Sequence, residues 1–280
     1  MMDTQMNLAS IPVVDGTMMD AVVVQPTAGG PWPGILYPFE SYGLTDHMLA
    51  NATKTAAQGF VVIAPDLYHR LGRLQTAPYW EFQGTWASNP YPILARVLMW
   101  ELRNDQIFDD MDAARDHLKS LSAVRADRLA AIGSWMGARI ALFYATLRPE
   151  IKALVQLYGA GAGSINHWED YLRFLSLTGQ KPPTDPSPAG NTRVRGVVMD
   201  HISKLEAPVL VLPTVRGNAS AEEGPVEAAL RKLGKPFETH DYPNSRMGFD
   251  NPSMPGAYNA EYAKDAWERT FAFLKKHLDS

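Results

Sequence analysis

The chain of 280 residues contains no cysteine, which excludes disulfides, thiolate metal ligands and a cysteine nucleophile. It also lacks a basic excess, because 26 Lys and Arg stand against 30 Asp and Glu, giving a net charge of −4. This balance argues against a nucleic-acid partner. No apolar run reaches about 18 residues, so we expect no membrane-spanning helix and no membrane partner. The N-terminus carries no basic-then-apolar leader, and we therefore expect a cytoplasmic protein.

The composition that is present is that of a folded globular protein. Hydrophobic residues make up 46% of the chain and charged residues 20%. A chain of this length is sufficient for one large α/β domain, and the sequence contains no internal repeat. We therefore expect a single domain over residues 1–280.

Strand and helix patterns alternate along the chain. A hairpin is expected over residues 8–25, around Asp15-Gly16. Further strands are expected at 34–37, 60–64, 129–132, 153–158, 209–212 and 237–242, and helices at 46–58, 93–102, 107–121, 136–147, 225–233 and 257–277. This alternation predicts a mostly parallel sheet with helices on both faces. Residues 160–204 are rich in glycine and proline, and we expect them to form a lid-like insertion over the carboxyl edge of the sheet.

The most informative segment lies between an expected strand and an expected helix. It reads Gly133-Ser134-Trp135-Met136-Gly137, with a glycine on each side of the central residue at a spacing of two. This is the frame of a nucleophile elbow, in which a tight turn and close helix packing require glycine. The spacing predicts a sharp turn with Trp135 at its apex.

Four segments together resemble the dienelactone hydrolase family of α/β-hydrolases. They are Phe39-Glu40-Ser41-Tyr42-Gly43, residues 57–68, residues 242–249, and Ala266-Trp267-Glu268-Arg269-Thr270. The resemblance runs from about residue 17 to residue 277 and implies the α/β-hydrolase fold for the chain.

The resemblance also implies where a catalytic triad would fall. The nucleophile position is Trp135, the histidine position is Met247, and the acid position is near Gly217 or Asn218. An indole has no nucleophilic oxygen or sulfur, and a thioether is no useful base. A neutral residue cannot stabilise an imidazolium. We therefore expect the triad mechanism to be absent.

A rebuilt hydrolase is the weaker alternative. It would use Ser134, one residue from the apex of the turn, as the nucleophile. Such a serine needs a base, and His201 or His240 would serve only if the fold brought it close.

Other parts of the pocket are implied by the same resemblance. The backbone N–H groups of Ser41 and Met136 would form an oxyanion hole, which side-chain changes need not destroy. Glu40 would lie beside Trp135, where loss of solvation raises the pKa of a carboxyl group and suits it to general acid or base chemistry. The alternative is that Glu40 only holds its loop through hydrogen bonds.

Several side chains are candidates for ligand contact. Trp135 and Tyr42 offer aromatic faces to a planar molecule, and Met247 would line the same pocket. Arg216 and Arg246 lie in the two loops that would carry the acid and the histidine. A pair of guanidinium groups there would hold a carboxylate through two hydrogen bonds each.

These features predict an α/β-hydrolase fold that binds a small apolar or aromatic ligand, with or without a carboxylate. The chemistry would be of isomerase, lyase or cyclase type, with Glu40 as acid or base. The alternative is a catalytically silent or engineered-inactive hydrolase that acts only as a binding protein. No two of the seven histidines lie within five residues of each other, and no phosphate-binding loop occurs, so we expect no metal and no cofactor.

Overall fold

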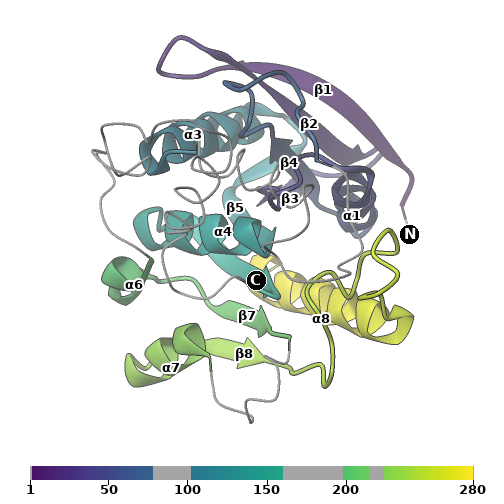
Figure 1. The fold of residues 1–280 in the computed structure, drawn as a ribbon. Helices are drawn as coiled ribbons and strands as arrows, with labels where there is room; N and C mark the ends of the chain where they lie inside the picture. Colours follow the sequence, from purple (N-terminus) through teal and green to yellow (C-terminus); the bar gives the residue numbers. More distant parts are fainter. Residues whose placement is uncertain (1, 78–101, 160–197, 215–223, 280) are drawn as a thin grey trace, which may run out of the picture.

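The computed structural model describes residues 2–77, 102–159, 198–214 and 224–279 (Figure 1). Its sheet has eight strands in the order β1-β2-β4-β3-β5-β6-β7-β8. The strands are β1 (Thr4–Pro12), β2 (Met18–Pro26), β3 (Trp32–Leu36), β4 (Val61–Pro65), β5 (Val124–Ser134), β6 (Ile151–Leu157), β7 (Val209–Leu212) and β8 (Phe237–Thr239). The helices are α1 (Asp46–Ala56), α3 (Asn104–Ser120), α4 (Met136–Leu147), α6 (Val198–His201), α7 (Pro225–Lys232) and α8 (Ala260–Leu278), with a 3₁₀ turn η1 at Ile202–Lys204.

The sheet is mostly parallel, as the sequence predicts. The hairpin β1–β2 and the pair β2–β4 are antiparallel, and the remaining pairs are parallel. The chain leaves β3 through α1 to reach β4, and leaves β4 through α3 to reach β5 on the other side of β3. Right-handed crossovers therefore place α1 on one face and α3 and α4 on the other (Figure 1).

The burial of the strands agrees with this placement of helices on both faces of the sheet. Every residue of β4 is buried, because helices cover both of its faces. The helix α8 lies beside α1, since the ammonium of Lys54 sits 5.0 Å from the ring centre of Trp267. Among the described helices, none combines the length and apolar character that crossing a bilayer requires.

Some expected boundaries are wrong by a few residues. The last strand ends at Thr239 instead of 242, because β7, its neighbour, is followed by Pro213, which has no N–H to continue the ladder. The last helix begins at Ala260, because the Asn259 side chain accepts hydrogen bonds from the N–H groups of Glu261 and Tyr262 and caps the helix there.

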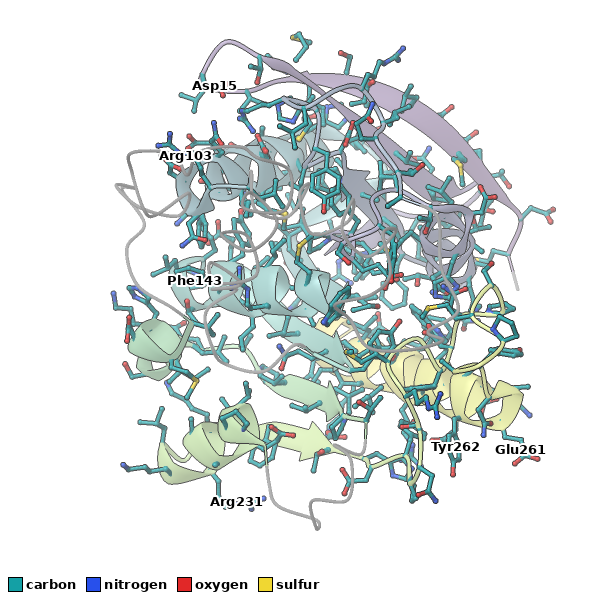
Figure 2. The ribbon with its side chains drawn as sticks, viewed as in Figure 1. Asp15, Arg103, Phe143, Arg231, Glu261 and Tyr262 are labelled. Atoms are coloured by element: carbon teal, nitrogen blue, oxygen red, sulfur yellow. The ribbon has the colours of Figure 1, made fainter. Side chains whose placement is uncertain are left out.

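The expected lid is described only at its end. Residues 198–204 form α6 and η1, which pack against α4: His201 stacks on Phe143 with ring centres 5.3 Å apart. Figure 2 shows Phe143 on α4 next to α6. Residues 160–197 and the expected helix at 93–102, apart from its last residue, lie outside the described part of the chain.

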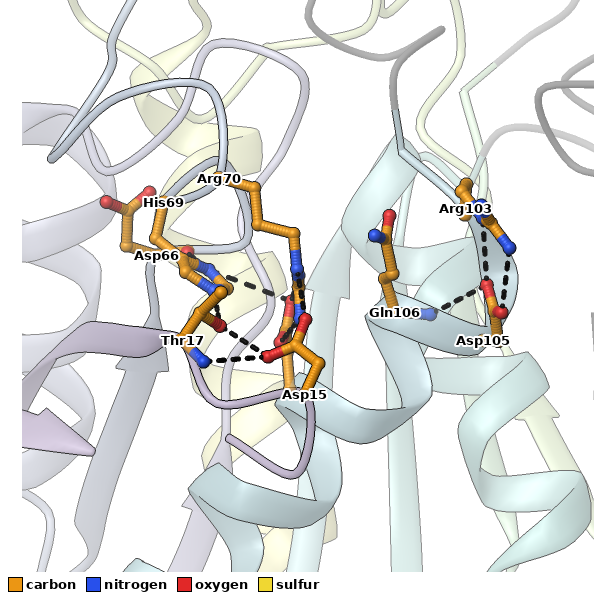
Figure 3. A network of polar contacts seen from close by, with 9 residues as sticks. Asp15, Thr17, Asp66, His69, Arg70, Arg103, Asp105 and Gln106 are labelled. Carbon is orange, nitrogen blue, oxygen red and sulfur yellow. Dashed lines mark hydrogen bonds and ion pairs between the residues drawn. The ribbon is translucent and has the colours of Figure 1, made fainter. Parts of the chain in front are cut away.

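A buried ion pair fixes the hairpin turn to the helical layer. Arg70 donates to both oxygens of Asp110 at 2.8 and 2.9 Å and to Asp15 at 2.8 Å. The Asp110 carboxylate is fully buried, whereas Asp15 is at the turn and accepts from Thr17. Figure 3 shows Arg70, Asp15 and Thr17 side by side. Arg70 therefore links the hairpin turn to α3.

We expect Arg70→Met to lower the free energy of unfolding by about 3 kcal/mol, because it leaves the buried Asp110 carboxylate without its partner. Urea unfolding followed by circular dichroism measures the change. The matched control is Arg269→Met, since the side chains of Arg269 and its partner Asp265 are 42% and 40% exposed. It should change stability little. Equal losses in the two variants would contradict this account of Arg70.

Candidate functional site

The candidate site lies at the carboxyl edge of the sheet, between two strands whose following helices cover opposite faces. The strands β3 and β5 are neighbours, but the chain leaves them toward helices on opposite faces. Open α/β sheets bind ligands in the crevice outside the carboxyl ends of the strands at such a point. The structure places residues 37–45 and the turn at Trp135 there, and the rings of Tyr42 and Trp135 are 6.3 Å apart.

The turn between β5 and α4 is tight and strained. Trp135 has φ 44° and ψ −108°, a conformation that costs a non-glycine residue on the order of 1–3 kcal/mol. Its N–H donates to the carbonyl of Leu157 at 3.1 Å. A Cβ atom on Gly133 would lie 2.3 Å from the backbone of Gly137. The two flanking glycines are therefore required by the turn, as their spacing predicts.

The second glycine also positions the neighbouring loop. A Cβ atom on Gly137 would lie 2.3 Å from the carbonyl oxygen of Pro38, so the loop after β3 runs directly against the start of α4. Met136 is the first residue of that helix, where backbone N–H groups have no helical acceptor and carry partial positive charge. The first turn of α4 contains no acidic side chain to neutralise it.

Buried polar groups line this loop. Glu40 is 3% exposed and Ser41 is fully buried. The carbonyl of Ser41 accepts from the Tyr68 hydroxyl at 3.0 Å, and the Glu40 carbonyl accepts from the N–H of Gly43 at 3.1 Å. Burial and then the charge of Glu40 raise the pKa of Tyr42 to about 12. Tyr42 is therefore a neutral hydrogen-bond donor at physiological pH.

The other expected site residues are placed as follows. Met136 is buried, Trp135 is half-buried, and Ser134 at the end of β5 is 1% exposed. Met247 is 40% exposed, and Arg246 beside it is exposed. Arg216, with Gly217 and Asn218, lies outside the described residues.

The two candidate bases for Ser134 have other partners. His201 stacks on Phe143, about two helical turns beyond the start of α4. His240 faces Asp265 of α8 at 3.5 Å, and its side chain is 40% exposed.

Arg139 is a basic residue of the site region with unusual surroundings. It lies in the first turn of α4, where its N–H donates to the carbonyl of Trp135 at 3.3 Å. Its Nε is buried and has no hydrogen-bond partner among the described residues. Burial lowers the pKa of Arg139 to about 9, so the guanidinium remains charged at neutral pH.

The sequence analysis missed a buried network centred on Asp250. The Tyr158 hydroxyl donates to Asp250 Oδ1 at 2.8 Å, and Trp267 Nε1 and Asn51 Nδ2 donate to Oδ2 at 3.0 and 3.3 Å. His47 Nε2 lies 3.5 Å from the same oxygen. Burial raises the pKa of Asp250, but the hydrogen bonds from His47, Tyr158 and Trp267 outweigh it and hold the pKa below its ordinary value.

This network ties the loop that carries Arg246 and Met247 to α1, β6 and α8. In the sequence, the residue that could have drawn attention to this network is Trp267, which lies in one of the four segments of the family resemblance. Among the described residues, no group of three or more His, Asp or Glu side chains is arranged to hold a metal ion.

A mostly parallel sheet covered on both faces, with a strained strand-turn-helix at its carboxyl edge, defines an α/β-hydrolase. The chain belongs to the dienelactone hydrolase family, whose model matches residues 19–278. This confirms the fold and the family that the four sequence segments indicate.

Named relatives are similar over nearly the whole chain. A provisionally named carboxymethylenebutenolidase from Methylorubrum extorquens is 28% identical over 269 residues, which are 95% of this chain and 79% of the relative. A provisionally named 2-oxo-3-(5-oxofuran-2-ylidene)propanoate lactonase from Bradyrhizobium is 25% identical over 92% of this chain and 89% of the relative. The crystal structure of a provisionally named dienelactone hydrolase from Klebsiella pneumoniae has a TM-score of 0.73 and 25% identity, covering 98% of this chain and 99% of that chain.

Proposed function

We propose that the protein binds a small apolar or aromatic molecule at the crevice between β3 and β5 and acts on it by acid–base chemistry without a nucleophile. The reaction would be an isomerisation, elimination or cyclisation. The observation that carries the proposal is the strained turn after β5, which keeps its elbow geometry while its apex is the indole of Trp135. An indole stacks on a planar ligand but cannot attack one.

Glu40 is the proposed acid–base group. Its buried carboxyl lies on the loop that runs against the start of α4. In its ionised form it would remove a proton next to a ligand carbonyl, and the resulting enolate oxygen would accept hydrogen bonds from the N–H groups of Met136 and Ser41. Such donors are most effective where charge develops and water is excluded. Tyr42 is an additional neutral donor beside Trp135.

A carboxylate on the ligand is supported by the basic groups of the region. Arg139, in the first turn of α4, has a charged and partly desolvated guanidinium, with its Nε unpaired among the described residues. Arg246 is exposed on the loop that carries Met247. A carboxylate is the natural partner of a guanidinium in such a place.

The names of the relatives favour lactone hydrolysis as the second candidate, which here would require Ser134. That serine is 1% exposed, at the end of β5 and off the apex of the turn. We therefore expect wild-type protein to hydrolyse short-chain aryl esters no faster than background at neutral pH. Release of the aryl alcohol measures the rate, and Ser134→Ala is the control. Turnover that disappears in Ser134→Ala would contradict the proposal and establish the hydrolase.

The acid–base proposal is tested with Glu40→Gln, which keeps the shape of the side chain but cannot titrate. Ligands are first found by their stabilisation of the protein against heat, using a panel of aryl lactones and aryl carboxylates. We then expect wild-type protein to exchange the proton next to the ligand carbonyl in deuterated water, measured by NMR, and Glu40→Gln to lose at least about 100-fold in that rate.

Binding by Glu40→Gln should remain within about threefold, since the variant keeps its pocket. The matched control is Glu238→Gln, an exposed carboxylate paired with Lys276. Exchange at the wild-type rate in Glu40→Gln would make Glu40 a structural residue. Ligands that bind without any exchange would leave the silent binding protein as the function.

A further inference from the structure

The two edges of the sheet are built very differently. At one edge, β8 has only three residues and carries the charge of Glu238, which pairs with Lys276. Short length and charge are the usual protection of a sheet edge against pairing with another strand. At the other edge, β1 is nine residues long and lies at the outside of the molecule (Figure 1).

The edge strand β1 has none of these protections. Its sequence, Thr4 to Pro12, contains no charged residue, and its only proline is the last residue. It pairs with β2 in one uninterrupted register, from Thr4 opposite Pro26 to Pro12 opposite Met18, so no bulge twists it away. Two of its apolar side chains, Met6 and Leu8, are 46% and 49% exposed.

The hydrogen bonds of the hairpin show which backbone groups of β1 have no strand partner among the described residues. The N–H of Val13 donates to Thr17 at 2.9 Å, and the N–H of Thr27 donates to Asp3 at 3.0 Å. In an antiparallel ladder the bonded residues alternate. Odd-numbered residues of β1 therefore face β2, and the N–H and C=O groups of the even-numbered residues point outward from the sheet.

We infer that β1 is a self-association edge, which pairs with β1 of a second copy of this chain. An antiparallel pair centred on Asn7 sets Met6 opposite Leu8 and Thr4 opposite Ser10, and the two-fold axis repeats each pairing. Every outward N–H and C=O of these four residues is then satisfied, and Pro12, which lacks an N–H, stays outside the ladder.

In this register Asn7 faces its own copy and positions 6 and 8 face each other, so a charge near the centre of β1 would lie close to the same charge of the second copy. The strand is neutral from Thr4 to Pro12, which removes this repulsion. The pairing joins two eight-stranded sheets into one continuous sheet, by the strand-addition mode that sheet edges use to bind extended partners.

Sedimentation velocity over a concentration series tests the inference with the full chain, whose mass is 31.0 kDa. We expect the wild-type protein to sediment as a dimer, and Ser10→Pro to sediment as a monomer. The Ser10 N–H points outward, so its loss should leave the β1–β2 ladder intact, which an unchanged circular dichroism spectrum checks. The control is Val14→Lys, which changes a 76% exposed residue outside the strand and should leave the dimer unchanged.

A charge-pair experiment tests the register. Leu8→Lys should weaken the dimer, and adding Met6→Glu in the same chain should restore it, because the new carboxylate of each copy then faces the new ammonium of the other. Hydrogen exchange supplies an independent measure: amides of Thr4, Met6, Leu8 and Ser10 should gain protection as the dimer forms. A monomer at all concentrations, or a dimer that Ser10→Pro and Leu8→Lys leave intact, would overturn the inference.

Discussion

Replacing Gly137 by alanine is expected to lower the free energy of unfolding by about 3 kcal/mol or more and to abolish ligand binding at the crevice. The added Cβ would lie 2.3 Å from the Pro38 carbonyl oxygen and 2.9 Å from that of Phe39. Both contacts are with backbone, so no flexible side chain can move aside to relieve them. The loop after β3 must therefore separate from the start of α4.

The loss of binding follows from the same displacement. The loop carries Glu40, Ser41 and Tyr42, and its contact with α4 sets their place relative to Trp135. Urea unfolding measures stability, and calorimetric titration with a ligand of the wild-type protein measures binding. The matched control is Gly256→Ala, because a Cβ there meets nothing within 4 Å. A Gly137→Ala protein as stable as this control would mean that the loop and α4 are not in close contact.

The turn at Trp135 could be predicted from sequence because its cause is local. Gly133 and Gly137 are four residues apart, and both are required by backbone contacts at one strand-turn-helix unit. The alternation of strands and helices could be predicted for the same reason, since the spacing of apolar residues within each segment indicates a helix or a strand. Within the described part of the chain, departures fall at element ends such as Thr239, where Pro213, which follows β7, interrupts the ladder.

The Asp250 network could not be predicted because its parts are far apart in the chain. Asn51, Tyr158 and Trp267 reach the same carboxylate from a helix, the end of a strand and the last helix. No periodicity or motif links positions with such separations. The family resemblance included Trp267 without a role for it, and the structure supplies one, as a donor to a buried carboxylate.

The network also explains how a loop with an exposed tip is held. Met247 is 40% exposed, but Asp250, three residues later, is 3% exposed and anchored on three elements. The loop at this edge of the sheet is therefore held in place by a buried residue, Asp250. Substitutions at Asp250 should consequently affect the whole fold.

We expect Asp250→Ala to lower the free energy of unfolding by about 4 kcal/mol, because it leaves several buried donors without an acceptor. The donors are the Tyr158 hydroxyl, the Trp267 indole N–H and the Asn51 amide. Asp250→Asn should cost about half as much, since its amide oxygen can replace Oδ2 while its NH₂ donates to the Tyr158 oxygen. Urea unfolding at neutral pH measures both. Asp241→Ala, an exposed aspartate of the preceding segment, is the control and should change stability little.

The pH dependence separates the charge of Asp250 from its hydrogen bonds. Its folded-state pKa is held below the ordinary value, so the folded state binds fewer protons than the unfolded chain. The ionised carboxylate therefore contributes stability above pH about 4, and the contribution is lost as pH falls through the lower folded-state pKa. Wild-type stability should decline between about pH 4 and pH 2, and Asp250→Asn should show a shallower decline over the same range. Parallel declines in the two proteins would mean that other carboxylates carry the acid sensitivity and that Asp250 acts through its hydrogen bonds alone.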